Sequence, residues 1–216
     1  MEKPILFNTE MVKAILEGGK TQTRRAIRNI RAYHMDGTPG KMPPWKPGDV
    51  LYVRETWSWM NAMDCGSPCI GPCKQYNGEY GCFIYKATNN IFTDGWNPSI
   101  HMPREAARLF LKVKDVRLER LRDVFFTDSA AILEVQKEGV DIGETCRACI
   151  EHYGYPCCID ADDDTECVEL DNPRYVLSKL WDSTIKPVEI DRFGWAANPW
   201  VWVIEFEKME GYHAGK

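Results

Sequence analysis

The sequence Leu16-Glu17-Gly18-Gly19-Lys20-Thr21-Gln22-Thr23-Arg24-Arg25 joins the end of a short helix to a cationic segment. Apolar residues at helical spacing, and side chains suited to cap the first turn, come before it: Asn8, Thr9, Met11, Val12, Ile15 and Leu16. Two consecutive glycines permit the left-handed backbone with which helices often end. These patterns predict a helix over about residues 9 to 18, followed by a segment suited to a polyanion or a polar substrate.

The segment after the glycines alternates as a β-strand does. Thr21, Thr23 and Arg25 would point to one side of a sheet, and Gln22 and Arg24 to the other. Lys20 lies at the junction, three positions before Thr23. Residues three apart share a face in a turn but not in a strand. Lys20 and Thr23 can therefore line one pocket only if the chain still turns at Lys20.

The composition predicts a globular protein. The 216 residues are 44% hydrophobic and 12% aromatic, which suffices for a substantial core in one domain or two small ones. The segment Met1-Glu2-Lys3-Pro4 lacks the apolar stretch of a signal peptide. No apolar run approaches the roughly 20 residues that span a bilayer. We therefore expect a cytoplasmic protein without a membrane partner.

The net charge of −5 comes from one acidic segment. Between Asp141 and Asp171 there are ten acidic residues and one basic residue, and the rest of the chain has 26 basic and 22 acidic residues, a balance of +4. Cations with no acid between them are concentrated at Lys20, Arg24, Arg25, Arg28 and Arg31. They form a candidate phosphate-binding patch, the alternative being a solvated basic rim.

Strand patterns outnumber helix patterns. Strands are predicted over residues 50–57, 83–87, 109–121 and 200–207, the third long and bent. A second helix is predicted from Thr127 or Asp128 to about Lys137, ended by Gly139, and a third from Pro173 to about Asp182. The inner face of the third helix is predicted at Leu177, Leu180, Trp181 and Thr184. Because strands and helices do not alternate regularly, we expect an α+β fold around a small β-barrel.

All nine cysteines fall in two stretches without a sustained period, at about residues 60–82 and 141–170, which resemble insertions. They are Cys65, Cys69, Cys73, Cys82, Cys146, Cys149, Cys157, Cys158 and Cys167. Without a signal peptide, extensive disulfide bonding is not expected. Cys146-x-x-Cys149 has zinc-knuckle spacing, so about four of the nine could bind a structural zinc or another thiolate-bound metal. The alternative is thiols, free or variably oxidised; the core itself requires no cofactor.

The residues resemble a known family. The segment Gly18 to Arg25, followed by Pro47-Gly48-Asp49-Val50-Leu51-Tyr52-Val53, resembles the ASCH domains of the PUA-like superfold. The segments Trp96 to Arg104, Lys137 to Val140 and Asn198 to Phe206 are similar to ASCH-type proteins carried by phages and prophages. The resemblance covers nearly the whole chain except the two cysteine-bearing stretches.

The resemblance implies one PUA-like domain over residues 1–212, a pseudo-barrel that binds RNA or a nucleotide in a basic cleft around Lys20, Thr23 and Arg25. In a phage-encoded protein the location would be the host cytoplasm. Some small bacterial members are amidohydrolases that deacetylate N4-acetylcytidine with a lysine, a threonine and a glutamate. The first two match Lys20 and Thr23 by motif, and Glu138 is the positional candidate for the third.

Such a set suits amide hydrolysis, with Thr23 as nucleophile, Lys20 as a base if burial lowers its pKa, and Glu138 as a proton shuttle. Lys20 and Thr23 could equally hold a phosphate. Further ligand-binding candidates are Arg24, Arg25, Arg54, Glu55, Trp57, Ser99, His101 and Arg104. The alternatives are an ion pair between Arg54 and Glu55, a helix cap or a surface loop contact for His101 and Arg104, and a core position for Trp57.

Three classes of function remain open. An RNA or modified-nucleotide binder would show salt-dependent affinity. An amidohydrolase requires the lysine, the threonine and an acid to converge. A phage interaction or morphogenesis protein would use the acidic segment as a surface for a protein partner or as a nucleic-acid mimic.

Overall fold

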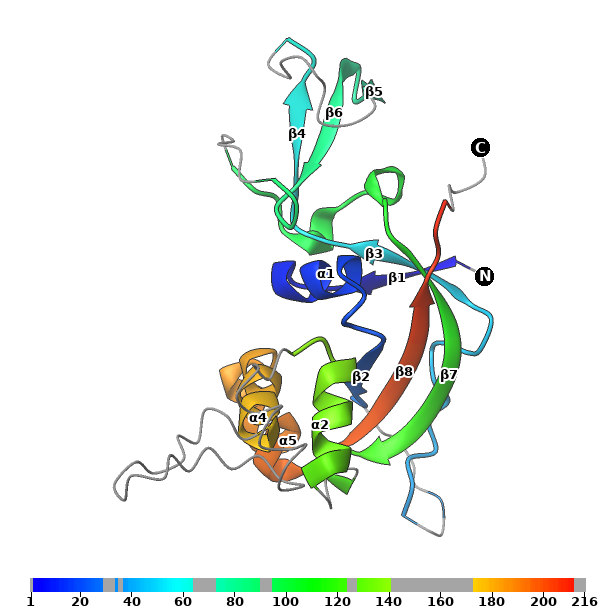
Figure 1. Ribbon diagram of the computed structural model, residues 1–216, viewed down its shortest axis with the longest axis vertical. Coiled ribbons are helices and arrows are strands. Elements are labelled where there is room, and N and C mark those ends of the chain that lie inside the picture. Colours follow the sequence, from blue (N-terminus) through cyan, green and yellow to red (C-terminus); the bar gives the residue numbers. More distant parts are fainter. Residues whose placement is uncertain are drawn as a thin grey trace, which may run out of the picture. The chain divides into compact units, whose positions relative to one another are not determined.

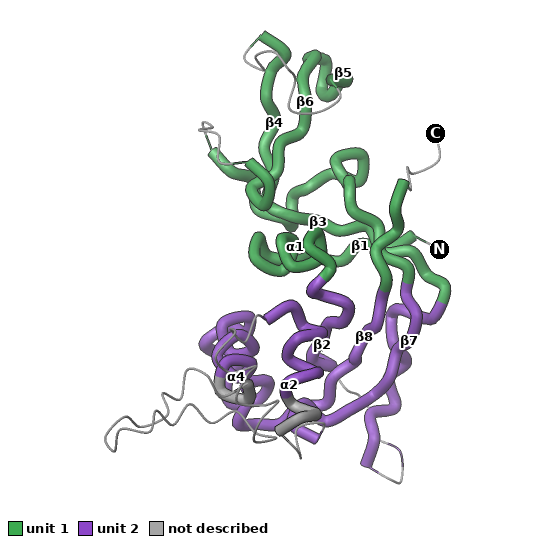
Figure 2. The backbone as a smooth tube through the Cα atoms, in the orientation of Figure 1, with its two compact units in different colours: residues 1–18, 48–112, 207–216 green, residues 19–47, 113–206 purple. Residues whose placement is uncertain are grey.

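The computed structural model describes residues 2–28, 34, 37–63, 73–89, 95–123, 128–140 and 173–211. The chain divides into two compact units, drawn green and purple in Figure 2. Unit 1 comprises Met1–Gly18, Gly48–Lys112 and Glu207–Lys216, and unit 2 comprises Gly19–Pro47 and Val113–Phe206. Each unit combines segments that are distant in sequence. The single domain expected over residues 1–212 stays a prediction.

The first sheet of unit 1 follows the N-terminus. Its strands, in order, are β1 (Glu2–Leu6), β3 (Val50–Arg54) and the first residues of β7 (Phe110–Arg120). β1 is parallel to β3, and β3 is antiparallel to β7. Leu51 and Val53 of β3 and Leu111 of β7 are almost fully buried, so this part of the sheet has an apolar core.

Helix α1 (Thr9–Leu16) forms as the sequence predicts. The Asn8 side chain accepts a hydrogen bond from the Met11 backbone N at 2.9 Å, which caps the first turn. After the helix, Gly18 has a φ of +82°, a left-handed conformation that favours glycine. Val12 and Ile15 are buried.

The second sheet of unit 1 has three antiparallel strands in the order β4 (Trp57–Asn61), β6 (Glu79–Tyr85) and β5 (Lys74–Tyr76) (Figure 1). One face is aromatic and packs on Met102 and Ala106, through Trp57, Trp59, Tyr76, Phe83 and Tyr85. The other face buries Cys82 and Ile84 against Met60, Cys73 and Trp96.

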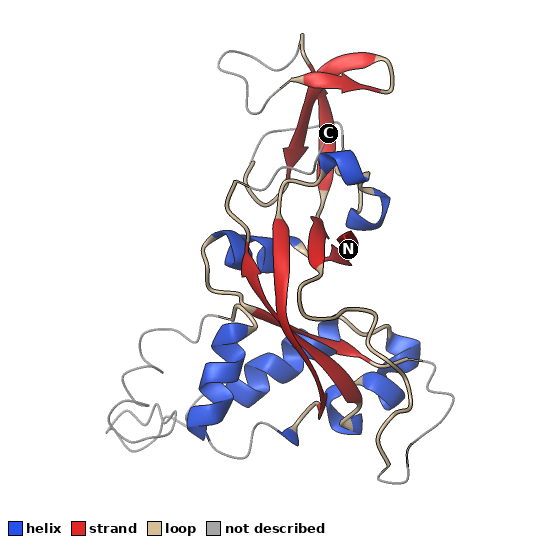
Figure 3. Ribbon diagram, turned by 90° about the vertical axis from the view of Figure 1, so that its right-hand side faces the viewer, coloured by secondary structure: helices blue, strands red, loops and turns tan. Residues whose placement is uncertain are grey.

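Unit 2 contains strands in the order β7, β8 (Trp200–Lys208) and β2 (Gln22–Ala26). The register of β2 on β8 is antiparallel, with Gln22 opposite Glu205 and Arg25 opposite Trp202. β7 and β8 are the long strands, and both bend (Figures 1 and 3).

Helices α2 (Asp128–Lys137), α4 (Pro173–Ser183) and α5 (Ile190–Phe193) lie to one side of these strands in Figure 1. The core between helices and strands consists of Leu121, Trp181, Ile185, Phe193, Val201 and Val203. Ile132 and Val135 of α2 pack on Leu177 of α4. Four short 3₁₀ helices complete the described elements: η1 (Ser99–His101), η2 (Arg104–Ala106), η5 (Pro187–Glu189) and η6 (Trp195–Ala197).

The α+β class is confirmed, and the predicted helices and long strands are present. Within the described residues, neither the sheet that contains β7 and β8 nor the three-stranded sheet of β4, β6 and β5 closes into a barrel. The strand predicted over residues 50–57 is two strands, because the chain leaves β3 after Arg54 and enters β4 at Trp57.

Three details of the sequence prediction need correction. The predictions did not include β1, and they missed β5 and the start of β6 within the supposed insertion at residues 60–82. Thr184 does not lie on the inner face of α4, because it is exposed beyond the helix end, while Ile185 is buried.

Among the described residues, no helix is long and apolar enough to cross a membrane.

Gly81 of β6 provides a test of the three-stranded sheet. A Cβ added there would lie 2.2 Å from Met60 O and 2.8 Å from the Trp59 ring. Because backbone and a packed indole cannot both move aside, Gly81→Ala should lower the free energy of unfolding by about 1 to 3 kcal/mol in urea titrations. Gly95→Ala is the control, since no atom lies within 4 Å of its added Cβ. Equal stability of the two variants would contradict this packing.

Candidate functional site

Lys20 lies where the chain leaves the glycine pair and approaches β2. Its backbone forms an isolated β-bridge with Glu138, the residue that follows α2. The Thr21 backbone N donates to Lys137 O at 3.0 Å, and the Phe206 backbone N donates to Thr21 O at 2.9 Å. The chain is therefore already extended at Lys20, held between the end of α2 and strand β8.

The Lys20 side chain points at the same glutamate. Its Nζ donates to Glu138 Oε2 at 2.9 Å and to the Glu138 carbonyl O at 2.7 Å. Arg24 Nη1 donates to the other oxygen, Glu138 Oε1, at 2.9 Å. The side chains of Lys20 and Arg24 are 0% and 1% exposed. One carboxylate thus contacts two buried cations.

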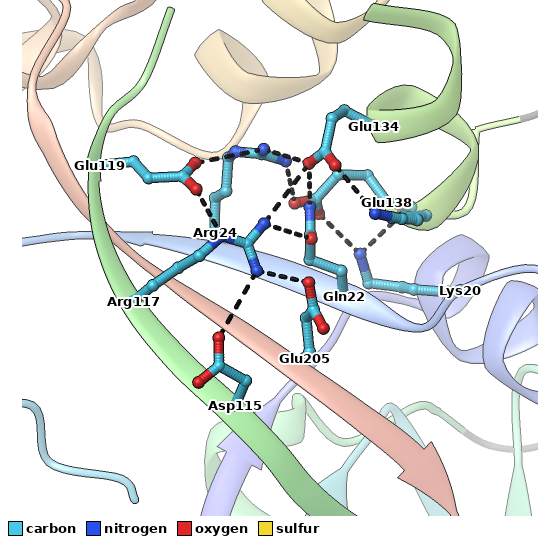
Figure 4. Close-up of polar contacts among 10 residues, drawn as sticks. Lys20, Gln22, Arg24, Asp115, Arg117, Glu119, Glu134, Glu138 and Glu205 are labelled. Atoms are coloured by element: carbon cyan, nitrogen blue, oxygen red, sulfur yellow. Dashed lines mark hydrogen bonds and ion pairs between the residues drawn. The ribbon is translucent and has the colours of Figure 1, made fainter. Parts of the chain in front are cut away.

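A second carboxylate, Glu134, lies one helical turn earlier on α2. It accepts hydrogen bonds from Gln22 Nε2 at 2.8 Å, Arg24 Nη2 at 2.6 Å and Lys137 Nζ at 3.0 Å (Figure 4). Residues four apart on a helix share a face, so Glu134 and Glu138 both meet β2. Gln22 and Arg24 are two positions apart on β2, so both of their side chains point toward these two glutamates.

Arg117 of β7 extends these contacts. Its Nη2 donates to Gln22 Oε1 at 3.0 Å, and its other nitrogens donate to Glu119 and Glu205. We call the whole set the ion-pair network: Lys20, Gln22, Arg24, Arg117, Glu119, Glu134, Lys137, Glu138 and Glu205 (Figure 4). Asp115 lies beside this set, 3.9 Å from Arg117 Nη1, so the four cations face five carboxylates and are neutralised within the protein.

Burial changes the acidity of two groups in the network. Removal from water lowers the pKa of Lys20, and the neighbouring Glu138 opposes part of that shift. Burial by itself raises the pKa of Glu134, but hydrogen bonds from Gln22, Arg24 and Lys137 outweigh it and bring the pKa to about 2. Glu134 is therefore ionised at neutral pH, while Lys20 releases its proton more readily than an exposed lysine.

Thr23 lies on the opposite face of β2 from the ion-pair network. Gln22 and Arg24 point to the network, and side chains alternate along a strand. Thr23 is 2% exposed and is paired with Ile204 of β8. The structure thus brings Lys20 and Glu138 together but directs Thr23 away from both.

The face that holds Thr23 carries cations. Arg25 is opposite Trp202 of β8, so the two side chains lie on the same face. Trp200, two positions before Trp202, shares that face as well. The Arg120 guanidinium lies 4.5 Å from the Trp200 ring centroid, which assigns the even-numbered residues of β7 to the same side. We call the accessible part of this side the basic face: Arg25, Lys114, Val116, Leu118, Arg120 and Trp200.

Strand alternation separates the charges in unit 2. None of the described strand residues on the basic face is acidic. The acidic residues of the same strands, Asp115, Glu119 and Glu205, alternate with them and point to the network side. Arg25 and Arg120 are half-buried and Lys114 is exposed. The predicted patch is therefore divided: Lys20 and Arg24 form ion pairs in the network, whereas Arg25 lies on the other face of β2, where burial lowers its pKa and the charge of Glu138 opposes part of that shift. Arg28, also predicted there, is exposed and paired with Glu189 at 3.2 Å, and Arg31 lies outside the described residues.

In unit 1, Arg54 and Glu55 do not form an ion pair with each other. Arg54 Nε donates to Met102 O at 2.9 Å, and its Nη2 donates to Ile100 O, which holds the segment between Pro98 and Pro103. Glu55 is 1% exposed, and both of its oxygens accept hydrogen bonds from Arg108 at 2.9 and 3.0 Å. Both side chains therefore hold their own unit together.

The other candidates in unit 1 are placed differently from one another. Trp57 is buried in the aromatic face, as the core alternative predicts. Arg104 pairs with Glu2 and lies 4.8 Å from the Tyr52 ring centroid. Ser99 and His101 lie in η1, where His101 is exposed. No described contact brings these residues to a common ligand site.

Glu134 and Arg117 make the most contacts in the ion-pair network, and neither was among the residues predicted from the sequence. Helical spacing from Glu138 was a signal for Glu134, since residues four apart share a face. Nothing local indicated that Arg117 meets Gln22, because 95 positions separate them. Their contact depends on the order of strands in the sheet.

The cysteine predictions fall mainly outside the described residues. Cys65, Cys69, Cys146, Cys149, Cys157, Cys158 and Cys167 lie there. Cys73 and Cys82 are described and pack in one cluster. Within the described part of the chain, no three His, Cys, Asp or Glu side chains gather as a metal site. The zinc site stays a prediction.

No protein-family model matches the chain, and neither does any curated protein or solved structure.

The low pKa of Glu134 predicts a contribution to acid unfolding. In the unfolded chain this carboxyl has an ordinary pKa of 4.5, so its stabilisation is present above pH 4.5 and is lost as the pH falls toward about 2. In Glu134→Gln, the free energy of unfolding should fall less between pH 4.5 and 2 than it does in the wild type, the difference being at most about 3 kcal/mol. Urea titrations at several pH values measure this. Glu10→Gln, which changes an exposed carboxylate, is the control. An unchanged decline in Glu134→Gln would show that Glu134 does not carry this effect.

Proposed function

We propose that this protein binds RNA or a nucleotide through the basic face of unit 2. One observation supports this most strongly: Arg25, Lys114 and Arg120 share a strand face on which no described position is acidic. Clustered cations of this kind attract phosphates. Trp200, against the Arg120 guanidinium, adds an aromatic ring of the sort on which bases stack.

The ion-pair network supports the proposal indirectly. Lys20 and Arg24 are buried and face carboxylates, so their charges act inside the protein. Removing one partner of a buried pair typically costs about 3 to 5 kcal/mol, which means that such pairs hold strands in place. The network thereby keeps β2 in the register that presents Arg25. The ligand-contacting residues thus differ from the predicted cleft around Lys20, Thr23 and Arg25, of which only Arg25 is retained.

The proposal keeps the ASCH-type, PUA-like resemblance and its phage or prophage setting. The order of helix, Lys-Thr segment, Gly-Asp strand and final strand supports it. A cytoplasmic location, a structural zinc and a protein partner for the acidic segment belong to the same proposal. The last two involve residues outside the described ranges.

Binding of a fluorescein-labelled single-stranded RNA, followed by anisotropy, tests the main proposal. Lys114→Gln and Arg120→Gln should each weaken binding about threefold to tenfold and reduce the slope of log affinity against log salt by about 1. Each change removes one phosphate-facing charge, so the loss should not depend on RNA sequence.

Lys179→Gln is the matched control, because it removes an exposed lysine of unit 2 from α4. It should leave affinity and salt slope unchanged. Equal losses in all three variants would mean that net charge alone governs binding, and absence of binding by the wild type would refute the proposal.

Hydrolysis of N4-acylated cytidine-type nucleosides is a second candidate. It is favoured by the Lys20–Glu138 pair at 2.9 Å, in which burial lowers the Lys20 pKa. Water would add to the acetyl carbon as Lys20 takes its proton. The C–N bond would then break as the proton passes from Lys20 through Glu138 to the cytidine nitrogen, and acetic acid would leave and ionise to acetate. This candidate ranks second because Lys20 is fully buried and Thr23 faces away.

Release of cytidine from N4-acetylcytidine, followed by chromatography, tests the second candidate. Lys20→Met should reduce turnover at least about 100-fold, because it removes the base. The variant loses one buried ion pair and is expected to be less stable, although Arg24 still pairs with Glu138, so its turnover is compared under conditions in which circular dichroism shows it folded. Lys137→Gln, which removes a network lysine bound to Glu134, should retain turnover. A wild-type protein without turnover would exclude hydrolysis of this substrate and leave the binding proposal standing.

A further inference from the structure

The hairpin between β5 and β6 brings two cysteines into one cluster. Asn77 and Gly78 form its two-residue turn, with φ values of +51° and +85°. Positive φ at both positions is typical of the type I′ turn, which closes antiparallel strands in a defined register. Lys74 is opposite Gly81. Continued by one residue, the same register places Cys73, immediately before β5, opposite Cys82.

The position of this pair in the ladder favours close side chains. Tyr76 and Glu79 flank the two-residue turn. The residues that flank such a turn are a hydrogen-bonded pair, and pair types alternate along an antiparallel ladder. Counting outward, Cys73 and Cys82 occupy a non-hydrogen-bonded position. There the Cα atoms are about 4.5 Å apart and the side chains are closest, within the range that a disulfide spans.

Packing supports the same arrangement. Cys73 packs against the cluster formed by Cys82 and Ile84, together with Met60 and Trp96. Cys82 is 0% exposed, whereas Cys73 is half-buried at the start of β5. The two sulfurs therefore differ in access to solvent, although they share one face of the sheet.

We propose that Cys73 and Cys82 form a reversible, redox-sensitive cross-strand pair whose reaction partner is a low-molecular-weight disulfide. This modification site is independent of the proposed RNA-binding face, and it leaves the seven other cysteines available for zinc.

The exposure of each sulfur sets the order of the reaction. The Cys73 thiolate attacks one sulfur of the small disulfide and expels a thiolate, which leaves a mixed disulfide on Cys73. Cys82, after losing its proton, attacks the Cys73 sulfur and expels the second small thiolate. Two protein thiols are oxidised, one small disulfide is reduced to two thiols, and β5 becomes covalently joined to β6. A large thiol reagent should meet Cys73 first, because Cys82 is enclosed.

Glutathione redox buffers test this on the full chain. After equilibration, remaining thiols are alkylated and the protein is digested, and mass spectrometry with fragmentation locates the linked residues. A Cys73–Cys82 link, lighter by two hydrogens than the two peptides with free thiols, is expected and should be lost on treatment with dithiothreitol. Because neighbouring thiols have a high effective concentration, the link should form at least about tenfold faster in native protein than in urea.

Cys73→Ser should abolish the link, and Cys69→Ser should leave its rate unchanged within about twofold. If a serine variant folds poorly, the linked cysteines identified by mass spectrometry in the wild-type protein still test the proposal. Three results would overturn the proposal: preferential linkage of Cys73 to another cysteine, persistence of both residues as thiols across the buffers, or stoichiometric zinc that protects both sulfurs.

Discussion

The structure of unit 2 depends on the requirement that a buried cation has a carboxylate beside it. Lys20 and Arg24 lie in or next to an outer strand of their sheet, and their charges are met by Glu134 and Glu138 at the end of α2. Burying an ammonium or guanidinium without such a partner would cost several kcal/mol. The helix end and the strand are therefore tied together across more than 100 positions of sequence.

Because side chains alternate along a strand, the pairing of the buried residues of β2 also fixes which side chains lie on its other face. Since Gln22 and Arg24 must face α2, Arg25 must face the other way. The same alternation in β7 directs Arg117 and Glu119 inward and Arg120 to the side of Trp200. A chain with a net charge of −5 can in this way present a local cationic surface. The acidity of the whole chain gives no indication of the charge on this face.

Local patterns were sufficient for most elements but not for the site. The helix at residues 9–16 could be recognised because its cap and its glycine lie next to it in sequence. The last strand could be recognised from its alternation. Glu138 was chosen by resemblance, and its contact with Lys20 is present. Thr23 was grouped with Lys20 because motifs are read along the chain, whereas its side chain follows the pleat of β2. The hairpin of β5 and β6 was missed because glycines and cysteines mask its short alternation.

The sequence by itself determined the α+β class, the ends of the main helices, the division of charge between residues 141–171 and the rest, and the concentration of cations after Gly19. These properties depend on neighbours within a few positions, where capping, spacing and alternation operate. Only the tertiary structure decided which of those cations are internal, that Glu134 and Arg117 join them, and that Cys73 packs in the cluster of Cys82. Such facts depend on strand order and on the pairing of buried charges, which bring together residues that no local pattern connects.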